Sequence, residues 1–137
     1  MDLKTIDLAG AAQRGTQVSL RHPVTNAPLL DEDHKPITIQ VLGKDSSIYL
    51  QVQRRLSDAR LNASLGRGSK FKISSAQLEQ DTIELLASVT VGWSENFKLG
   101  DITEFTHETA MSVYESASWI REQVSEVVED RSAFLGN

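Results

Sequence analysis

Two segments near the N-terminus alternate between apolar and polar residues. They span residues 16–20 and 37–42 and are rich in β-branched side chains. A repeat of two residues with this composition predicts β-strands. All three prolines of the chain lie between them, which indicates turns on either side of a short middle strand at Leu29 and Leu30. We therefore expect a small antiparallel sheet of two or three strands.

From Asp45 onward the apolar residues recur at the spacing of helices. Asp45 or Ser46 is placed to cap the first helix, which we expect to end near residues 63–66. The residues on its apolar stripe are Ile48, Tyr49, Val52, Leu56 and Ala59. A basic, glycine-containing link follows at 65–70, and we expect this link to be flexible.

Three further helices follow the link. Ser74 and Gln77 have the spacing of a capping box, and the helix that they open is expected to end at Gly92. Thr106 is placed to cap the next helix, and a break at 116–118 separates it from the last one. These elements predict an α+β protein that is predominantly α-helical, with a small N-terminal antiparallel sheet followed by about four helices.

The two tryptophans each stand at one end of an apolar helical pattern. Trp93 follows the second helix, and Trp119 begins the last one. Large aromatic side chains at such positions usually anchor a core, so we expect both to be structural. An exposed tryptophan would instead be a candidate contact for a partner. We also expect Phe134 and Leu135 to pack against the body of the protein.

The length of 137 residues, of which 39% are hydrophobic, fits one domain over 1–137. Within it, we assign 15–43 to the sheet and 45–137 to the helical part, whereas 1–14 form either a mobile arm or a short added element. The absence of cysteine excludes disulfides and thiolate ligands. No apolar run has the length of a membrane span, and the first residues lack the order of a signal peptide. We therefore expect no membrane contact.

The net charge of −5 is unevenly distributed. Residues 54–72 carry six basic residues against Asp58, whereas residues 73–137 carry twelve acidic residues against three basic ones. Solvated helix faces are the commoner cause of such a pattern, and self-association through complementary charges is the alternative. Because the whole chain is acidic, we do not expect it to bind nucleic acid. The candidate partner-binding residues are Arg54, Arg55, Arg60, Arg67 and Lys70.

Residues that carry chemistry do not gather into a recognisable motif. His22, His34 and His107 are far apart, and without cysteine they do not suggest a metal site. The link at 66–70 lacks the spacing of a phosphate-binding loop. The acidic pairs have no nucleophile or histidine beside them, and the serines lack the known hydrolase patterns. We therefore expect no catalytic residue, no cofactor and no enzymatic activity.

Three stretches, taken in order, carry a resemblance. They are VSLRHPVTNAPL with PITIQVLGKDSSIYLQVQRR, then Val91-Gly92-Trp93, and then WIREQV with DRSAFL at the C-terminal end. They resemble a family of small proteins that are encoded in the tail modules of long-tailed bacteriophages and prophages and are generally assigned as tail assembly chaperones. The resemblance covers most of the chain from about residue 16 onward, and the ending is its most specific part.

This resemblance implies a protein that binds the tape measure protein, keeps it in solution and helps recruit tail tube subunits. It also implies a location in the host cytoplasm and absence from the mature virion. The alternative is a structural virion protein of the phage tail or of the head–tail connector. A nucleic-acid-binding regulator is a third class, and it rests only on the basic segment 54–72.

Overall fold

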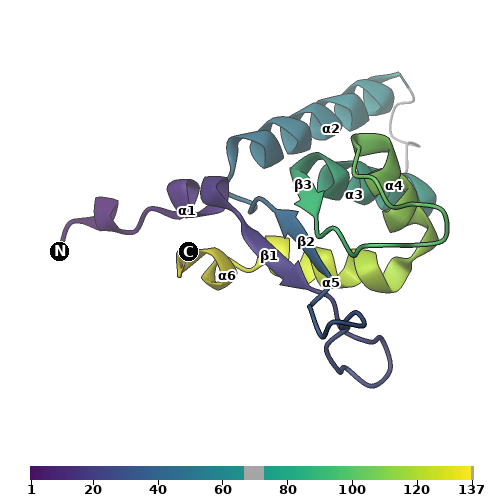
Figure 1. The fold of residues 1–137 in the computed structure, drawn as a ribbon. Coiled ribbons are helices and arrows are strands. Elements are labelled where there is room, and N and C mark those ends of the chain that lie inside the picture. Colours follow the sequence, from purple (N-terminus) through teal and green to yellow (C-terminus); the bar gives the residue numbers. More distant parts are fainter. Residues whose placement is uncertain (67–72, 137) are drawn as a thin grey trace.

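The computed structural model describes residues 1–66 and 73–136. Figure 1 shows a small sheet with helices gathered around it. The described elements, in chain order, are η1 (Leu3–Thr5), α1 (Leu8–Arg14), β1 (Thr16–Ser19), β2 (Thr38–Val41), α2 (Ser47–Leu65), α3 (Ser75–Val89), β3 (Thr90–Trp93), α4 (His107–Ser116), α5 (Ser118–Glu129) and α6 (Ser132–Leu135). The predicted class, α+β with helix dominating, is confirmed.

The sheet is antiparallel and has the strand order β1-β2-β3. β1 and β2 confirm the two strands that the alternation predicts. The predicted middle strand at Leu29 and Leu30 is wrong, because the bonds of this segment do not continue into a ladder. The N–H of Leu29 donates to the carbonyl of Leu20, the carbonyl of Leu29 accepts the N–H of Ile37, and Leu30 forms an isolated bridge to Pro36. Pro28 and Pro36 lack the N–H groups that a longer ladder needs.

The third strand comes instead from the end of the second predicted helix. That helix is α3, and it ends at Val89 instead of the predicted Gly92. The N–H of Thr90 still bonds back to carbonyl groups of the last helical turn, and the chain then passes directly into β3. The β-branched run of Val89, Thr90 and Val91 favours a strand here, and Gly92 lies opposite Gln40 of β2.

Most helix boundaries follow from capping residues. Ser46 caps α2, which ends within the range predicted for it. Ser74 accepts the N–H of Gln77, but the Gln77 amide is directed to Asp81, so only half of the predicted capping box forms. Thr106 caps α4 as predicted, with a complete box, and α4 and α5 separate at the predicted break.

The core lies between the inner face of the sheet and the helices α3, α4 and α5. α5 lies against β1 and β2, and α3 packs on both α4 and α5. Tyr114 of α4 is fully buried at its centre, and its hydroxyl lies 2.6 Å from the hydroxyl of Thr90. Burial raises the pKa of Tyr114 to about 12. The aliphatic residues with no exposed surface, among those that the structure describes, are Ile39, Val41, Val89, Ala110, Val113, Val124 and Val128.

Both tryptophans pack against this core from half-buried positions. Trp93 stacks on Phe97 with ring centroids 4.2 Å apart and meets Phe105 edge-on at 5.1 Å. Its indole N–H donates to the backbone carbonyl of Thr103. Trp119 lies in the first turn of α5. The sequence-based expectation that both residues are structural agrees with these positions.

The helices near the two ends of the chain, α1 and α6, meet on one side of the molecule. Residues 8–14 form α1, whose Ala11 and Ala12 are buried, and α1 packs against α6. The residues before α1 extend away from the body, where Met1 and Leu3 are exposed (Figure 1). At the other end Phe134 is buried, whereas Leu135 is 52% exposed.

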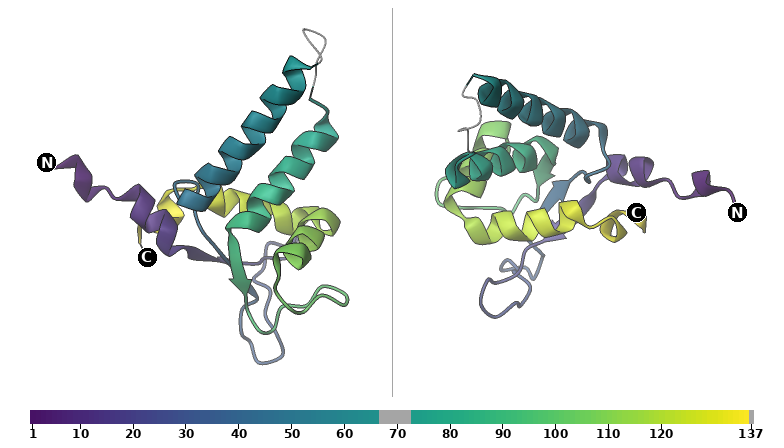
Figure 2. Two further views of the ribbon diagram at one scale, coloured as in Figure 1. Left: turned by 90° about the horizontal axis from the view of Figure 1, so that it is seen from above. Right: turned by 180° about the vertical axis from the view of Figure 1, so that it is seen from behind.

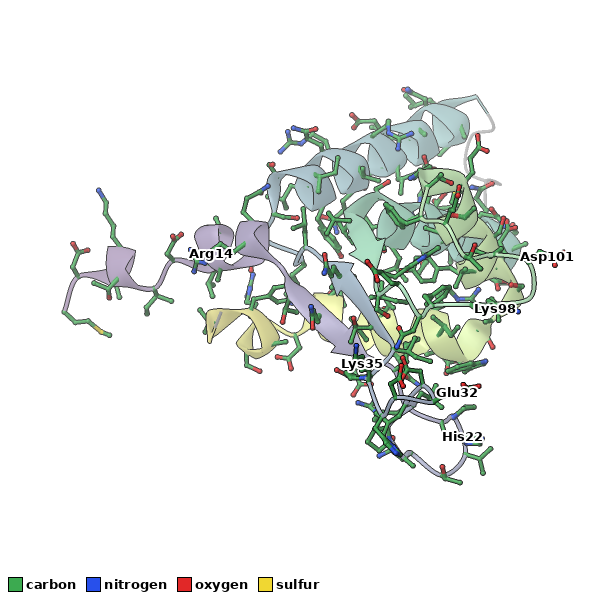
Figure 3. All side chains as sticks on the ribbon, viewed as in Figure 1. Arg14, His22, Glu32, Lys35, Lys98 and Asp101 are labelled. Atoms are coloured by element: carbon green, nitrogen blue, oxygen red, sulfur yellow. The ribbon has the colours of Figure 1, made fainter. Side chains whose placement is uncertain are left out.

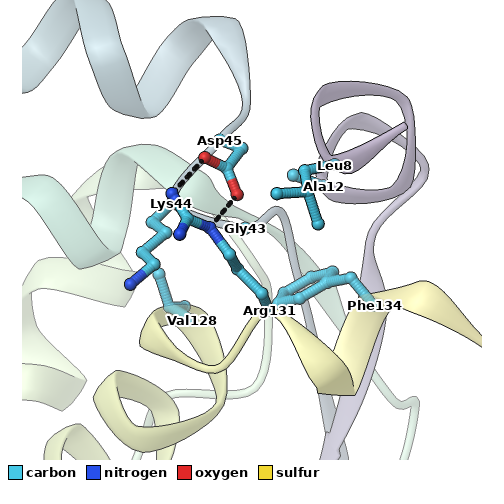
Figure 4. Close-up of a pocket in the computed structure, with 8 residues that line it drawn as sticks. All are labelled: Leu8, Ala12, Gly43, Lys44, Asp45, Val128, Arg131 and Phe134. Atoms are coloured by element: carbon cyan, nitrogen blue, oxygen red, sulfur yellow. Dashed lines mark hydrogen bonds and ion pairs between the residues drawn. The ribbon is translucent and has the colours of Figure 1, made fainter. Parts of the chain in front are cut away.

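Figure 4 shows the small cleft where these terminal helices meet the loop before α2. Gly43 lies so close to its neighbours that an added Cβ would stand 3.0 Å from Ala12 and 3.1 Å from Phe134. Beside it, the guanidinium of Arg131 forms two hydrogen bonds, of 2.8 and 3.0 Å, to the carboxylate of Asp45. These bonds hold the pKa of Asp45 below its ordinary value. Through these contacts, the helices at both ends of the chain pack against the start of α2.

Candidate protein-binding surface

Helices α2 and α3 lie side by side and project together from the body (Figure 2). The buried residues of α2 are Tyr49, Val52 and Leu56, all of which belong to the half of the helix nearest the sheet. The remaining part of α2, from Ser57 to Leu65, contributes no buried residue. We call this helical pair the α2–α3 hairpin, and in its outer half the side chains of α2 are exposed or only partly buried.

Two ion pairs join the helices of the hairpin. Arg60 contacts Asp81 at 2.7 Å, and the second oxygen of that carboxylate accepts a hydrogen bond from the Gln77 amide. Asp81 is buried, so this pair is shielded from water. Arg55 contacts Glu84 at 2.8 Å, but its side chain is 60% exposed. The pair of Arg60 with Asp81 therefore contributes to the fold, whereas the pair of Arg55 with Glu84 is worth little.

The structure separates the five basic residues that the charge pattern selects. Arg55 and Arg60 contact acidic residues of the same chain, so the expected attraction between the basic segment and the acidic C-terminal half exists within one molecule. Arg54 is exposed and forms no ion pair within the described residues. Arg67 and Lys70 lie outside the described residues.

α2 also carries an exposed apolar face that the sequence does not predict. Leu50, Leu61 and Leu65 are 45%, 58% and 74% exposed. At about 100° per residue these leucines fall within about 60° of one another, on the side opposite the buried stripe, and Arg54 lies among them. We call these four residues the leucine face. The signal in the sequence is a set of leucines out of phase with the core stripe, and such leucines also occur singly on many surfaces.

The start of α3 adds to the apolar surface of the hairpin. Ile73, just before the helix, is 36% exposed, and Leu78 in its first turns is 45% exposed. In the outer half of the hairpin, Leu61 and Leu65 of α2 are thus exposed, and Leu78 of α3 and Ile73 just before it are exposed as well. Groups of exposed apolar side chains mark interaction surfaces more often than isolated ones do.

His22, Asp31 and Glu129 occupy structural positions. His22 accepts two backbone N–H groups through Nδ1, which shapes a turn. The carboxylate of Asp31 accepts hydrogen bonds from Asn96 and from the backbone of its own turn, and these bonds lower its pKa. Glu129 accepts the hydroxyl of Tyr49 at 2.7 Å. These groups are occupied in holding the fold and are not directed toward a common point.

The connections between elements carry many of the remaining charges. Figure 3 shows His22, Glu32 and Lys35 on the connection between β1 and β2, whereas Lys98 and Asp101 lie on the connection before α4. All five side chains are exposed. The two groups come from separate loops, and this arrangement is typical of a solvated surface.

Two further kinds of feature are absent from the residues that the structure describes. In residues 1–66 and 73–136, no three His, Cys, Asp or Glu side chains are grouped so that they could hold a metal ion. In the same ranges, no helix combines the length and the apolar character that crossing a membrane requires. The strongest feature outside the core is therefore the leucine face.

The chain matches no model of a known protein family, and neither curated proteins nor solved structures include a match to it.

Proposed function

We propose that the protein is a non-enzymatic assembly chaperone of a phage tail, and that it binds the helical tape measure protein through the outer half of the α2–α3 hairpin. The tail context comes from the resemblance in sequence. The observation that supports a binding role is the leucine face, with Leu61 and Leu65 largely exposed on a projecting helix. The sequence also contains no catalytic motif, which is why we propose a binding role instead of an enzymatic one.

The chemistry of the leucine face suits a helical client. Leu61 and Leu65 are one turn apart, so their side chains stand next to each other and present an apolar ridge. A client helix with a stripe of apolar residues can pack along such a ridge. Arg54 lies on the same face and is available to a carboxylate of the client. Recruitment of tail tube subunits, which the resemblance implies, has to use another surface while the client occupies this one.

The test is to express the tape measure protein from the same tail module together with the full chain. We expect the wild-type chain to keep the client in the soluble fraction and to copurify with it. The double substitution Leu61→Ser and Leu65→Ser should abolish both effects without lowering the stability of the chaperone, because neither side chain is buried. The matched control is Leu135→Ser, since this leucine is similarly exposed but lies on α6.

Two results would overturn the proposal. Equal recovery of the client with wild-type chain and with the double variant would show that the leucine face is not the binding site. Detection of the chain in purified, mature particles at the level of a stoichiometric component would instead make it a structural virion protein.

A further inference from the structure

β1 is an edge strand, and part of its backbone faces away from the sheet. β1 pairs with β2 in the register Thr16 to Val41 through Ser19 to Thr38. The next residue, Leu20, donates its N–H to Ile37, which fixes the alternation of the ladder. Every second residue of an antiparallel strand bonds to its neighbour, so the N–H and C=O groups of Gln17 and Ser19 point away from β2.

At Arg21, the next residue whose backbone N–H and C=O point away from β2, both groups have hydrogen-bond partners. The N–H of Arg21 donates to the side-chain oxygen of Gln123, and its C=O accepts from the side-chain nitrogen of Gln123, both at 2.9 Å. A neighbouring strand would make this same pair of bonds. For Gln17 and Ser19, no partner outside the β1–β2 ladder is found within the described residues. The outward backbone groups of Arg21 are therefore paired with α5, whereas those of Gln17 and Ser19 are left for another partner.

The two edges of the sheet differ in their protection. At the other edge, β3 carries an irregularity that leaves Val91 as an extra residue between its pairs with β2. Such bulges discourage the addition of a further strand. β1 has a regular register and contains no proline, lysine or bulge. Its Gln17 and Ser19 are exposed and uncharged, so β1 keeps the features of an edge that accepts a strand.

We propose that the edge of β1 binds an extended segment of a partner protein, which adds to the sheet as a fourth strand. Its N–H and C=O groups would pair with those of Gln17 and Ser19, giving four backbone hydrogen bonds. This site is separate from the leucine face and does not rest on the function proposed above.

Charges at the two ends of β1 define the chemistry of the segment. Arg14, labelled in Figure 3, precedes the strand. It lines a shallow hollow that extends from Gln17 across the sheet to Gln40 and Val91. Arg21 follows the strand and reaches Glu126 only at 3.8 Å. An acidic residue in the added segment, placed next to α1, is therefore favoured by Arg14. Antiparallel pairing of β1 with its counterpart in a second copy would bring Arg14 of one close to Arg21 of the other, so the like charges disfavour a second copy as the occupant.

The experiment follows the backbone amides of the full chain by nuclear magnetic resonance. The probe is an acetylated and amidated hexapeptide of alternating threonine and valine, with glutamate at one end. We expect the probe to slow hydrogen exchange at Gln17 and Ser19 by at least about tenfold at saturation, because the added strand must then detach from β1 before these amides can exchange. The same peptide, N-methylated at the residues that pair, should have no effect, and a lysine-ended peptide should bind more weakly.

The matching substitution on the protein is Ser19→Pro. It removes an N–H that points outward and leaves the bonds to β2 in place, so the fold should persist while the probe no longer binds. Gln17→Thr keeps the outward N–H and serves as the control. If Ser19→Pro unfolds the chain, the N-methylated peptide still tests the backbone pairing on the unaltered protein.

Three results would overturn this proposal. The first is the absence of any response at millimolar probe. The second is equal binding of the N-methylated peptide. The third is protection of Gln17 and Ser19 in the absence of probe that grows with protein concentration, which would make a second copy the occupant.

Discussion

Reversing the charge of three neighbouring arginines separates structural from exposed residues on α2. The substitutions Arg54→Glu, Arg55→Glu and Arg60→Glu make the same chemical change at three sites that differ in contacts. Arg60 pairs with buried Asp81, whereas Arg55 pairs with Glu84 at an exposed position, and Arg54 forms no ion pair in the described part of the chain. The free energy of unfolding should therefore fall by very different amounts.

The magnitudes follow from the burial of each pair. Removing one partner of a buried pair costs about 3–5 kcal/mol, and because the Arg60 side chain is 33% exposed we expect about 2–3 kcal/mol for Arg60→Glu. The pair of Arg55 with Glu84 is mostly exposed, so Arg55→Glu should cost about 0.5–1 kcal/mol. Arg54→Glu should change stability by less than about 0.5 kcal/mol.

The assay is urea denaturation followed by tryptophan fluorescence, at low and at high salt. Salt should reduce the effect of Arg55→Glu more than that of Arg60→Glu, because the second pair is shielded from solvent. Equal losses of stability at all three positions, or an Arg60→Glu variant as stable as the wild type, would refute the assignment of Arg60 to the fold. Among the three, only Arg54→Glu then tests client binding without disturbing the hairpin.

Three further predictions concern the core and its edges. Gly43→Ala should lower the free energy of unfolding by about 1–3 kcal/mol in thermal or urea melts, because the new methyl group overpacks the contact between Ala12 and Phe134; a neutral substitution would show that the terminal helices move apart easily. Burial raises the pKa of Tyr114 above the ordinary value of 10.0 to about 12, so the unfolded chain ionises first and stability should fall as the pH rises from 10 to 12. Tyr114→Phe should show a smaller fall in urea midpoints over that range, and an equal fall would assign the effect to other groups. Trp119→Ala should cost about 2 kcal/mol by urea denaturation, less than a full aromatic truncation, because its indole is only half-buried; no loss of stability together with loss of client binding would make Trp119 a contact residue.

Local patterns were sufficient to predict the parts of the fold that depend on neighbouring residues. The alternation at β1 and β2 and the caps at Ser46 and Thr106 are decided by a few adjacent side chains. The third strand is not predicted because Thr90–Trp93 continues an apolar helical pattern; its β-branched residues favour a strand only weakly, and pairing with distant β2 decides for the extended backbone.

The candidate binding surface was predicted only in part, for a similar reason. The charge pattern selected Arg55 and Arg60, but their partners Glu84 and Asp81 become visible only when α2 and α3 are placed side by side. The leucine face was missed because an exposed leucine has no local signature that distinguishes it from a buried one.

The direct passage from α3 into β3 has a mechanical consequence. No loop separates the two elements, and the N–H of Thr90 still bonds to the last turn of the helix. A hinge needs residues whose backbone torsions can change, and here those torsions are fixed by the helix on one side and by pairing with β2 on the other. The hairpin is therefore a lever fixed rigidly to the sheet. If a client binds at its tip as proposed, a load from that client would pass to the central strand, and a protein held at the edge of β1 would keep a constant orientation relative to the client.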